Sequence, residues 1–208
     1  MATVAGGMRG IIIGLDEVGR GAVAGPLTVA AVALPWQPVI SGLDDSKKLS
    51  ASRRQKLSAV ISQVALTIGI FHVEAAQIDE LGMSAALRLA FSQALASAVD
   101  TGNVEPDLVL VDGYAQNIHA KELAVPKADS RFACVAAASI IAKVCRDAIM
   151  VAATTAYDGY DFDQHKGYGT AAHIAAIREL GLCDLHRQSF CRNFLDTPNT
   201  PNTPNTPS

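Results

Sequence analysis

Apolar residues along the chain fall into short β-branched runs that alternate with longer helical repeats. The runs predict strands over residues 10–15, 27–34, 65–73, 107–111 and 120–126. Apolar positions three and four residues apart predict helices over residues 50–63, 76–81, 84–99, 130–156 and 170–181. Since strands come early and helices are interleaved and follow on the C-terminal side, we expect an α/β fold with a mixed sheet.

The length and the turn-forming residues indicate how the chain is divided. A chain of 208 residues, half of them hydrophobic, is long enough for one sizeable core but not for two full domains. We therefore expect one domain over residues 10–196, after a flexible N-terminus over residues 1–9. Residues 197–208 repeat Thr-Pro-Asn and contain no large apolar group, so we expect a disordered tail.

Charge and hydropathy limit the partners. The net charge of −3 gives no general attraction to nucleic acid, but five of the ten residues from Lys47 to Lys56 are basic. That cluster is either a solvated helix face or a local nucleic-acid contact. No stretch reaches the roughly 18 apolar residues of a membrane span, and no secretory signal is recognisable. We expect a soluble, cytoplasmic protein, monomeric by default.

Four cysteines without a Cys-x-x-Cys pair predict reduced, mostly buried thiols rather than disulfides. The alternative is a zinc site that combines His173, Cys183, His186 and Cys191. Their spacing is irregular, which disfavours zinc.

The segment from Gly14 to Pro26 carries the strongest chemical signal. Asp16 and Glu17 follow an isoleucine-rich run, at or near the end of the strand predicted there, and the turn Gly19-Arg20-Gly21 comes next. Burying unpaired carboxylates costs several kcal/mol, so a cation is expected to neutralise at least one of them. Glycines on both sides of Arg20 allow a backbone to approach a ligand closely. The pattern predicts a metal site beside a substrate-reading turn, against the alternative of a solvated surface pair.

Two further acids stand where elements end or begin. Asp112 directly follows the strand over residues 107–111, and Asp129 precedes the long helix. If the first and fourth strands are neighbours, Asp16 and Asp112 emerge at corresponding edges. Oxygen ligands of this kind suit Mg²⁺ or Mn²⁺, and two such ions could cleave a phosphodiester. A turn pair for Asp112 and a helix cap for Asp129 are the structural alternatives.

Six segments together resemble bacterial ribonuclease HII, in the family's order, over roughly residues 10 to 192. They are residues 16–26, Asp45-Ser46-Lys47-Lys48-Leu49, Val111-Asp112-Gly113, residues 127–147, His165-Lys166-Gly167-Tyr168-Gly169-Thr170, and His186-Arg187-Gln188-Ser189-Phe190. Cys191-Arg192 departs from the family, which usually has a proline after the Ser-Phe pair.

The resemblance implies a ribonuclease H-like fold: a mixed five-stranded sheet flanked by helices, with a C-terminal helical segment. It implies an endonuclease that hydrolyses the RNA strand of RNA–DNA hybrids and cuts 5′ to single ribonucleotides in duplex DNA, with two ions of Mg²⁺ or Mn²⁺. By matching positions, the catalytic, metal-binding carboxylates are Asp16, Glu17, Asp112 and Asp129. The implied ribose and deoxyribose contacts are Gly19, Arg20, Gly21 and Tyr168, and the implied phosphate contacts are Ser46, Lys47, Ser139 and Lys143.

Other interpretations are less consistent with the sequence. A non-catalytic nucleic-acid-binding module would not need clustered acids beside a glycine turn. A nucleotide-binding phosphotransferase would need a Gly-x-x-x-x-Gly-Lys loop, which is absent. The sister family, ribonuclease HIII, carries an extra N-terminal domain, and only nine residues precede the first predicted strand. The spacing Gln188-x-x-Cys191-x-x-Phe194 suggests either a sliding-clamp docking peptide or a helix end packed on the core.

Overall fold

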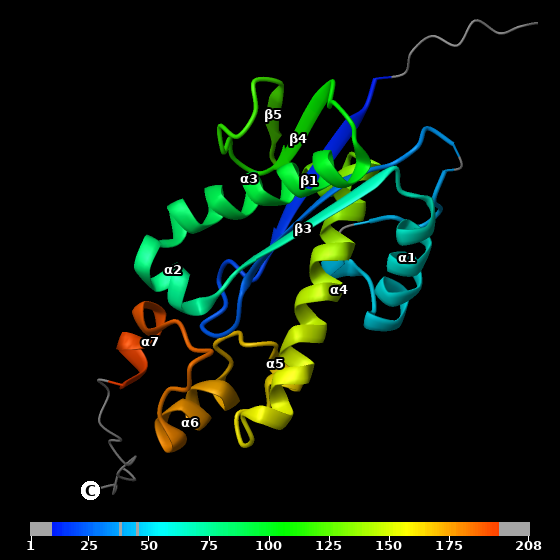
Figure 1. The fold of residues 1–208 in the computed structure, drawn as a ribbon. Helices are drawn as coiled ribbons and strands as arrows, with labels where there is room; N and C mark the ends of the chain where they lie inside the picture. The colour runs from blue at the N-terminus through cyan, green and yellow to red at the C-terminus, as the bar shows by residue number, and fades with distance from the viewer. Residues whose placement is uncertain (1–9, 38, 45, 196–208) are drawn as a thin grey trace, which may run out of the picture.

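Five strands form one mixed sheet in the order β3-β2-β1-β4-β5 (Figure 1). The computed structural model describes residues 10–37, 39–44 and 46–195. The strands are β1 (Ile12–Val18), β2 (Leu27–Ala33), β3 (Thr67–Val73), β4 (Leu108–Asp112) and β5 (Glu122–Val125). β1 is antiparallel to β2 and β2 to β3, whereas β4 is parallel to both β1 and β5. The predicted α/β class and mixed five-stranded sheet are confirmed.

Seven α-helices and two short 3₁₀ turns accompany the sheet within the described residues. They are η1 (Ser46–Lys48), α1 (Ala51–Val64), α2 (Ala75–Leu81), α3 (Met83–Gly102), η2 (Ala128–Ser130), α4 (Ala133–Ala156), α5 (Phe162–His165), α6 (Ala171–Leu180) and α7 (Gln188–Leu195). The side chains of Ser50 and Thr170 accept the amide hydrogens of Arg53 and His173 and so cap the N-termini of α1 and α6.

β2 is buried along its whole length because helices cover both faces of the sheet. Its residues Leu27, Val29 and Ala31 join a core with α2 and α3, whereas Ala30 and Val32 join a core with α1 and α4. This explains why the sequence Leu-Thr-Val-Ala-Ala-Val-Ala is apolar at every position but Thr28 rather than alternating. α3 crosses the front of the sheet and α4 lies behind it (Figure 1).

The start of α4 lies against β1 at Gly14. A Cβ atom at Gly14 would come within 2.5 Å of the backbone of Cys134 and Val135. Only glycine fits there, and the close approach places the first turns of the helix directly beneath the strand that carries Asp16.

The structure corrects several predicted boundaries. β1 continues to Val18, so Asp16 and Glu17 lie within the strand and not after it. The long helix begins at Ala133, and its N-cap is Phe132, so the helix-cap alternative for Asp129 is wrong. Residues 158–169, between the last two predicted helices, contain the short helix α5. The predictions for residues 1–9 and 197–208 lie outside the described residues.

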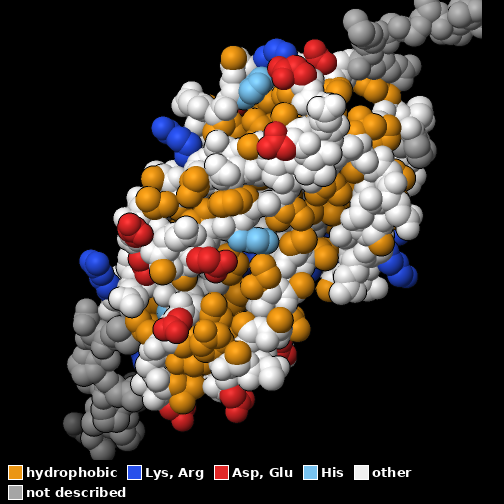
Figure 2. All heavy atoms as spheres, viewed as in Figure 1, with side chains coloured by type: hydrophobic (Ala, Val, Ile, Leu, Met, Phe, Trp, Pro, Cys, Tyr) orange, Lys and Arg blue, Asp and Glu red, His pale blue; other side chains and the backbone are white. Residues whose placement is uncertain are grey.

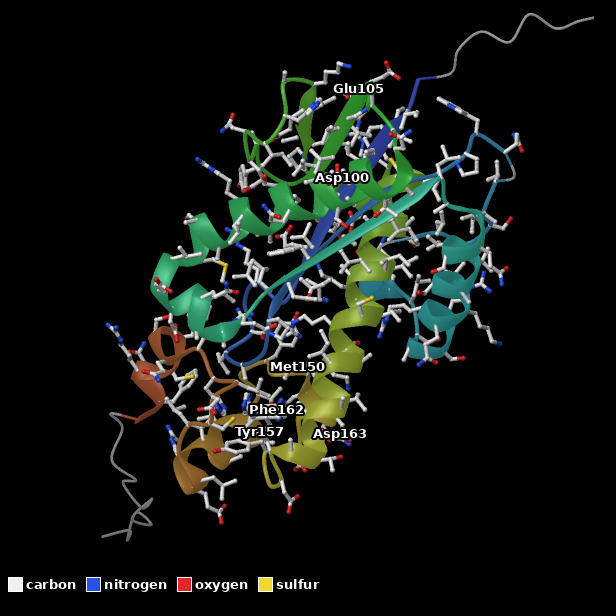
Figure 3. The ribbon with its side chains drawn as sticks, viewed as in Figure 1. Asp100, Glu105, Met150, Tyr157, Phe162 and Asp163 are labelled. Carbon is white, nitrogen blue, oxygen red and sulfur yellow. The ribbon has the colours of Figure 1, made fainter. Side chains whose placement is uncertain are left out.

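The C-terminal segment packs beyond one end of the sheet, on the last turns of α4 (Figure 1). Met150 of α4 and Phe162 of α5 are fully buried in one cluster, with Tyr157 packed against it (Figure 3). Tyr160 stacks on Phe162 with ring centroids 5.4 Å apart. Within the part of the chain that the structure describes, no helix combines the length and hydropathy needed to cross a bilayer.

Candidate active site

Asp16 and Asp112 lie side by side on neighbouring parallel strands. Leu15 of β1 is in register with Val111 of β4, so the next residue of each strand is the acid. Asp16 is only 6% exposed, and its Oδ1 accepts the amide hydrogen of Glu17 at 2.7 Å. Asp112 Oδ1 accepts the amide hydrogen of Ala128 at 2.6 Å, which ties η2 to the end of β4. The predicted neighbourhood of the two strands is confirmed.

Glu17 projects from the opposite face of β1, because side chains alternate along a strand. Together with Asp112 and Arg20 it lines a cleft of about 380 Å³ at the end of the sheet. The cleft also contains Arg88 of α3, and Tyr114 and Gln116 of the loop after β4. Glu17 and Asp112 therefore open to the cleft, whereas the buried Asp16 lies on the other face of β1 and does not line it.

Burial raises the pKa of Asp16 to about 8, although the Ser139 hydroxyl, which hydrogen-bonds its carboxylate, opposes this. Burial also raises the pKa of Glu17 to about 7, against the attraction of Arg20, whose Nη1 lies 3.9 Å from Glu17 Oε1. The charge of Asp112 raises both values further. Burial and the nearby carboxylates thus make the charged forms of Asp16 and Glu17 costly, and a cation beside them would offset that cost.

Asp129 is half-buried in η2, immediately after the residue that Asp112 binds. It is not among the groups that shift the pKa of Asp16 or Glu17. Over residues 10–37, 39–44 and 46–195, no three His, Cys, Asp or Glu side chains converge closely enough to hold a metal ion. The structure brings Asp16, Glu17 and Asp112 into mutual electrostatic influence and places Asp129 on η2, next to the residue that Asp112 binds.

Ser46 and Ser139 are both buried, at 2% and 3% exposure, and their hydroxyl oxygens are 2.9 Å apart. Ser139 also hydrogen-bonds Asp16. The sequence suggested phosphate contacts for these serines. Their burial instead favours a supporting role, because a hydroxyl that holds Asp16 from α4 is not presented to a ligand.

The two predicted lysines differ in their surroundings. Lys47 is exposed on η1, and its charge lowers the pKa of Glu17, so it lies near the cleft. Lys143 is mostly buried, with its Nζ 2.7 Å from Asp147 Oδ1 and 5.8 Å from the centre of the Tyr168 ring. Arg54 lies 3.8 Å from the same Asp147 carboxylate, which links the basic helix α1 to α4.

The Gly19-Arg20-Gly21 turn packs against the protein at Gly19 and faces open space at Gly21. Gly19 has φ of +92°, and a Cβ there would lie 2.2 Å from Nε of Arg146. At Gly21 a Cβ would meet nothing within 4 Å, so this glycine faces open space. The Arg20 side chain is 56% exposed. The turn thus presents backbone and one guanidinium beside Glu17.

Tyr168 belongs to a segment bonded directly to the residues after this turn. The Gly167 carbonyl accepts the amide hydrogens of Val23 and Ala24, at 2.9 and 3.1 Å. Tyr168 is half-buried, and the guanidinium carbon of Arg146 lies 5.3 Å from the centre of its ring. The structure therefore brings Tyr168 next to the glycine-arginine-glycine turn, from which it is separated by almost 150 residues in sequence.

Sequence reasoning did not identify Arg88 and Tyr114, which line the cleft together with Arg20. Arg88 is exposed on α3, and Tyr114 is 78% exposed after Asp112-Gly113. The loop that carries Tyr114 is ordered by Glu122, whose carboxylate accepts the amide hydrogens of Gln116 and Ile118. No local pattern identifies Arg88. An exposed aromatic after an Asp-Gly pair was a signal for Tyr114.

Lys and Arg side chains are few on the face shown in Figure 2, where they lie toward the margins. Toward the middle of that face, hydrophobic and uncharged side chains surround a few acidic groups and a histidine. This face therefore offers little basic surface for a phosphate backbone.

The histidines of the C-terminal segment form a hydrogen-bonded chain and not a zinc site. His173 Nδ1 donates to the Tyr168 carbonyl at 3.0 Å, so its Nε2 accepts from Nε2 of His186, also at 3.0 Å. The remaining nitrogen of His186 accepts the amide hydrogen of Cys183 at 2.9 Å. Cys191 lies in a separate cluster against Val23. All four cysteines are unpaired, as predicted.

The packing of α7 bears on its Gln-x-x-Cys-x-x-Phe spacing. Cys191 is fully buried, and Phe190 and Phe194 pack against its cluster. This packing is that of a helix end on the core. The sliding-clamp docking peptide stays a prediction.

Solved structures of similar shape define the class of protein. Ribonuclease H2 from Pyrococcus horikoshii superposes with a TM-score of 0.72 at 23% identity, over 89% of this chain and 97% of that one. The structure of the PCNA:RNase HII complex from Archaeoglobus fulgidus gives 0.71 at 25% identity, over 86% and 94%. Bst-RNase HIII in complex with Mn²⁺ gives 0.70 at 23% identity, over 89% and 69%. The fold is ribonuclease H-like, as expected.

Sequence relatives identify the family. The family model described as Ribonuclease HII matches residues 13–193. Ribonuclease HII of Ruminiclostridium cellulolyticum is 44% identical over 186 residues, which cover 89% of this chain and 71% of the relative. Ribonuclease HII of Nitrosococcus oceani is 44% identical over 188 residues, which cover 89% and 92%. The chain belongs to the ribonuclease HII family and is a ribonuclease H enzyme.

Proposed function

We propose that this enzyme hydrolyses the RNA strand of RNA–DNA hybrids and cuts 5′ to single ribonucleotides embedded in duplex DNA. The observation that carries the proposal is the adjacency of Asp16 and Asp112 on parallel strands, beside the glycine-arginine-glycine turn. Acids of this kind suit cleavage of a phosphodiester, and the turn suits recognition of a ribose next to it.

Asp16, Glu17, Asp112 and Asp129 would hold divalent cations, for which we propose two ions of Mg²⁺ or Mn²⁺. Carboxylate oxygens are the ligands these ions prefer, and the raised pKa values of Asp16 and Glu17 indicate uncompensated negative charge that a cation would neutralise. When bound, the ions activate the attacking water and stabilise the leaving oxygen. The products would carry a 3′-hydroxyl and a 5′-phosphate.

The protein residues would position the substrate. Backbone amides of the turn would read the ribose 2′-hydroxyl, which is the group that distinguishes RNA from DNA. Gly21 faces open space and leaves room for that approach. The Tyr168 ring would lie against the deoxyribose on the 3′ side, and Lys47 would contact the phosphate backbone together with Lys143. In this scheme Ser139 of α4 supports Asp16, and Ser46 of η1 supports Ser139.

The test is cleavage of a labelled DNA duplex that contains one ribonucleotide, with Mg²⁺ or Mn²⁺ supplied separately. We expect one cut on the 5′ side of the ribonucleotide and none in an all-DNA duplex. Asp112→Asn should bind the duplex but cut it at least about a hundredfold more slowly, since it removes a metal ligand and a transition-state charge.

Asp107→Asn is the matched control, because it makes the same chemical change at the opposite end of the same strand region, where Asp107 accepts the Ile11 amide hydrogen at 2.8 Å. Its rate should stay close to that of the wild type. Absence of cleavage by the wild type with either metal, or an Asp112→Asn variant of full activity, would contradict the proposal. The second outcome would favour a site built from other residues.

A further inference from the structure

Two arginines, Arg146 and Arg187, are fully buried at the junction between the glycine-arginine-glycine turn and the Tyr168 segment. Within the described residues, neither forms an ion pair with an Asp or Glu. A buried guanidinium without a carboxylate is costly, and burial lowers the pKa of both, that of Arg187 to about 10. Such a cost requires a specific use of their donors.

All the hydrogen bonds of these guanidinium groups go to backbone carbonyls. Arg146 donates to Pro26 at 2.8 Å, to Ala24 at 3.0 Å and to Lys166 at 2.8 Å. It therefore bridges the residues after the turn and the residue two before Tyr168, while its plane lies over the Tyr168 ring.

Arg187 completes the connection from the C-terminal side. It donates twice to Gly25, at 3.0 and 2.8 Å, and once to Arg20 at 3.1 Å. Its own amide donates to Val23 at 2.9 Å. The carbonyl of Arg20, in the middle of the turn, is thus held by a side chain from the start of α7.

The backbones in this region leave no room for adjustment. A Cβ at Gly167 would lie 2.3 Å from the Ala24 carbonyl oxygen, and one at Gly25 would lie 2.2 Å from Sδ of Met150. The turn and the Tyr168 segment therefore meet backbone to backbone, and the two guanidinium forks fix their relative position.

We propose that Arg146 and Arg187 are positioning residues that hold the turn and Tyr168 at one spacing, so that the enzyme recognises a ribonucleotide followed by a deoxyribonucleotide as a unit. The inference rests on the proposed function. A lysine cannot replace either residue, because a single ammonium group does not reproduce a fork of five donors in a fixed plane. An arginine-to-lysine substitution keeps the positive charge and removes the fork of donors, so it is the decisive test of the proposal.

The experiment is a double-mutant cycle on the full-length enzyme with Arg187→Lys, Tyr168→Ala and both together. It compares kcat/KM on a duplex with one ribonucleotide and on a long RNA–DNA hybrid. We expect each single variant to lose on the order of tenfold on the single ribonucleotide and much less on the hybrid. The double variant should lose little more than the worse single variant, because coupled residues are not additive.

The control is Phe162→Leu, which weakens the packing of the same segment without touching the guanidinium bonds. It should lower thermal stability and leave the ratio of the two activities unchanged. If Arg187→Lys does not fold, as judged by circular dichroism, Arg146→Lys takes its place in the cycle.

Two results would overturn the inference while the wild type cuts both substrates. One is multiplication of the losses in the double variant, and the other is an unchanged activity ratio in the lysine variant. A wild type that cuts the hybrid but not the single ribonucleotide would also overturn it. A wild type that cuts neither substrate overturns the proposed function itself, which keeps the two failures distinct.

Discussion

Replacing Asp16 by asparagine should make the metal-free protein more stable while abolishing activity. The wild-type carboxyl is 6% exposed, and burial raises its pKa from 3.8 to about 8. Between these values the unfolded chain has released a proton that the folded protein still holds, so stability falls as the pH rises from about 4 to about 8. Asparagine has the same shape as the protonated acid and does not titrate.

The size of the effect follows from the linkage relation. At pH 7 the unfolded aspartate is about three pKa units above its midpoint, and each unit is worth about 1.4 kcal/mol. At pH 7 the wild type has thus lost about 4 kcal/mol of its free energy of unfolding, which the variant retains. Glu17, whose pKa burial raises to about 7, is present in both proteins, so the difference between them reports Asp16 together with its coupling to Glu17.

Urea denaturation of both proteins in EDTA, from about pH 5 to about pH 9, measures this difference. The free energy of unfolding of the variant should exceed that of the wild type by an amount that grows as the pH rises and levels off near pH 8. Added Mg²⁺ or Mn²⁺ should stabilise the wild type and not the variant, since a ligand stabilises the state that binds it. A variant that is less stable at every pH, or a difference independent of pH, would refute the reasoning.

Three other changes probe separate parts of the molecule. Arg88→Ala should raise KM several-fold and reduce the salt slope of substrate binding by about 1, because one phosphate contact is lost. Lys121→Ala, at the opposite end of β4, should change neither quantity. The pKa of His173 is lowered by burial to about 4. Its contribution to stability should therefore fall by up to about 3 kcal/mol as the pH drops from about 6.5 to about 4, since only the unfolded chain takes up the proton. His173→Gln should flatten that part of the urea-measured pH profile, and an unchanged slope would count against the hydrogen-bonded histidine chain. Gly14→Ala should cost about 1–3 kcal/mol in thermal or urea denaturation, because its Cβ would collide with the start of α4, and an unaltered midpoint would contradict that packing.

The sequence was sufficient for the sheet because the strand runs are strongly β-branched and uninterrupted. The alternation within β1 was not foreseen, since the isoleucine run suggested a strand that stops before its acids. In the structure β1 continues through Val18, because Asp16 pairs with Ala30 and Glu17 with Val29 on the fully buried β2. Tertiary pairing overrides the local reluctance of carboxylates to enter a strand.

The candidate site was partly accessible for a different reason. The sequence placed Asp16 and Asp112 at corresponding edges on the condition that the first and fourth strands are neighbours, and the structure meets that condition. Ser139 of α4 supports Asp16 of β1, more than one hundred residues away in sequence. Arg146 of α4 likewise contacts Ala24, more than one hundred residues away, and Lys166, which lies in a different element. No periodicity encodes such contacts, because they depend on how α4 lies against the sheet.

The parallel pairing of β1 with β4 has a consequence for the order of folding. β1 and β2 are antiparallel neighbours joined by residues 19–26, and β3 pairs with β2 after residues 34–66, so both pairings close shorter loops than the pairing of β1 with β4. β4 reaches β1 only after α1, β3, α2 and α3, and the contact between Ile11 and Asp107 spans 96 positions. Closing so long a loop is entropically costly, and non-local pairings slow folding. We therefore expect the antiparallel unit of β1, β2 and β3 to form first, and Asp112 to reach Asp16 in a late step. Partly folded chains would then lack the pairing of Asp16 with Asp112 and be inert toward nucleic acids.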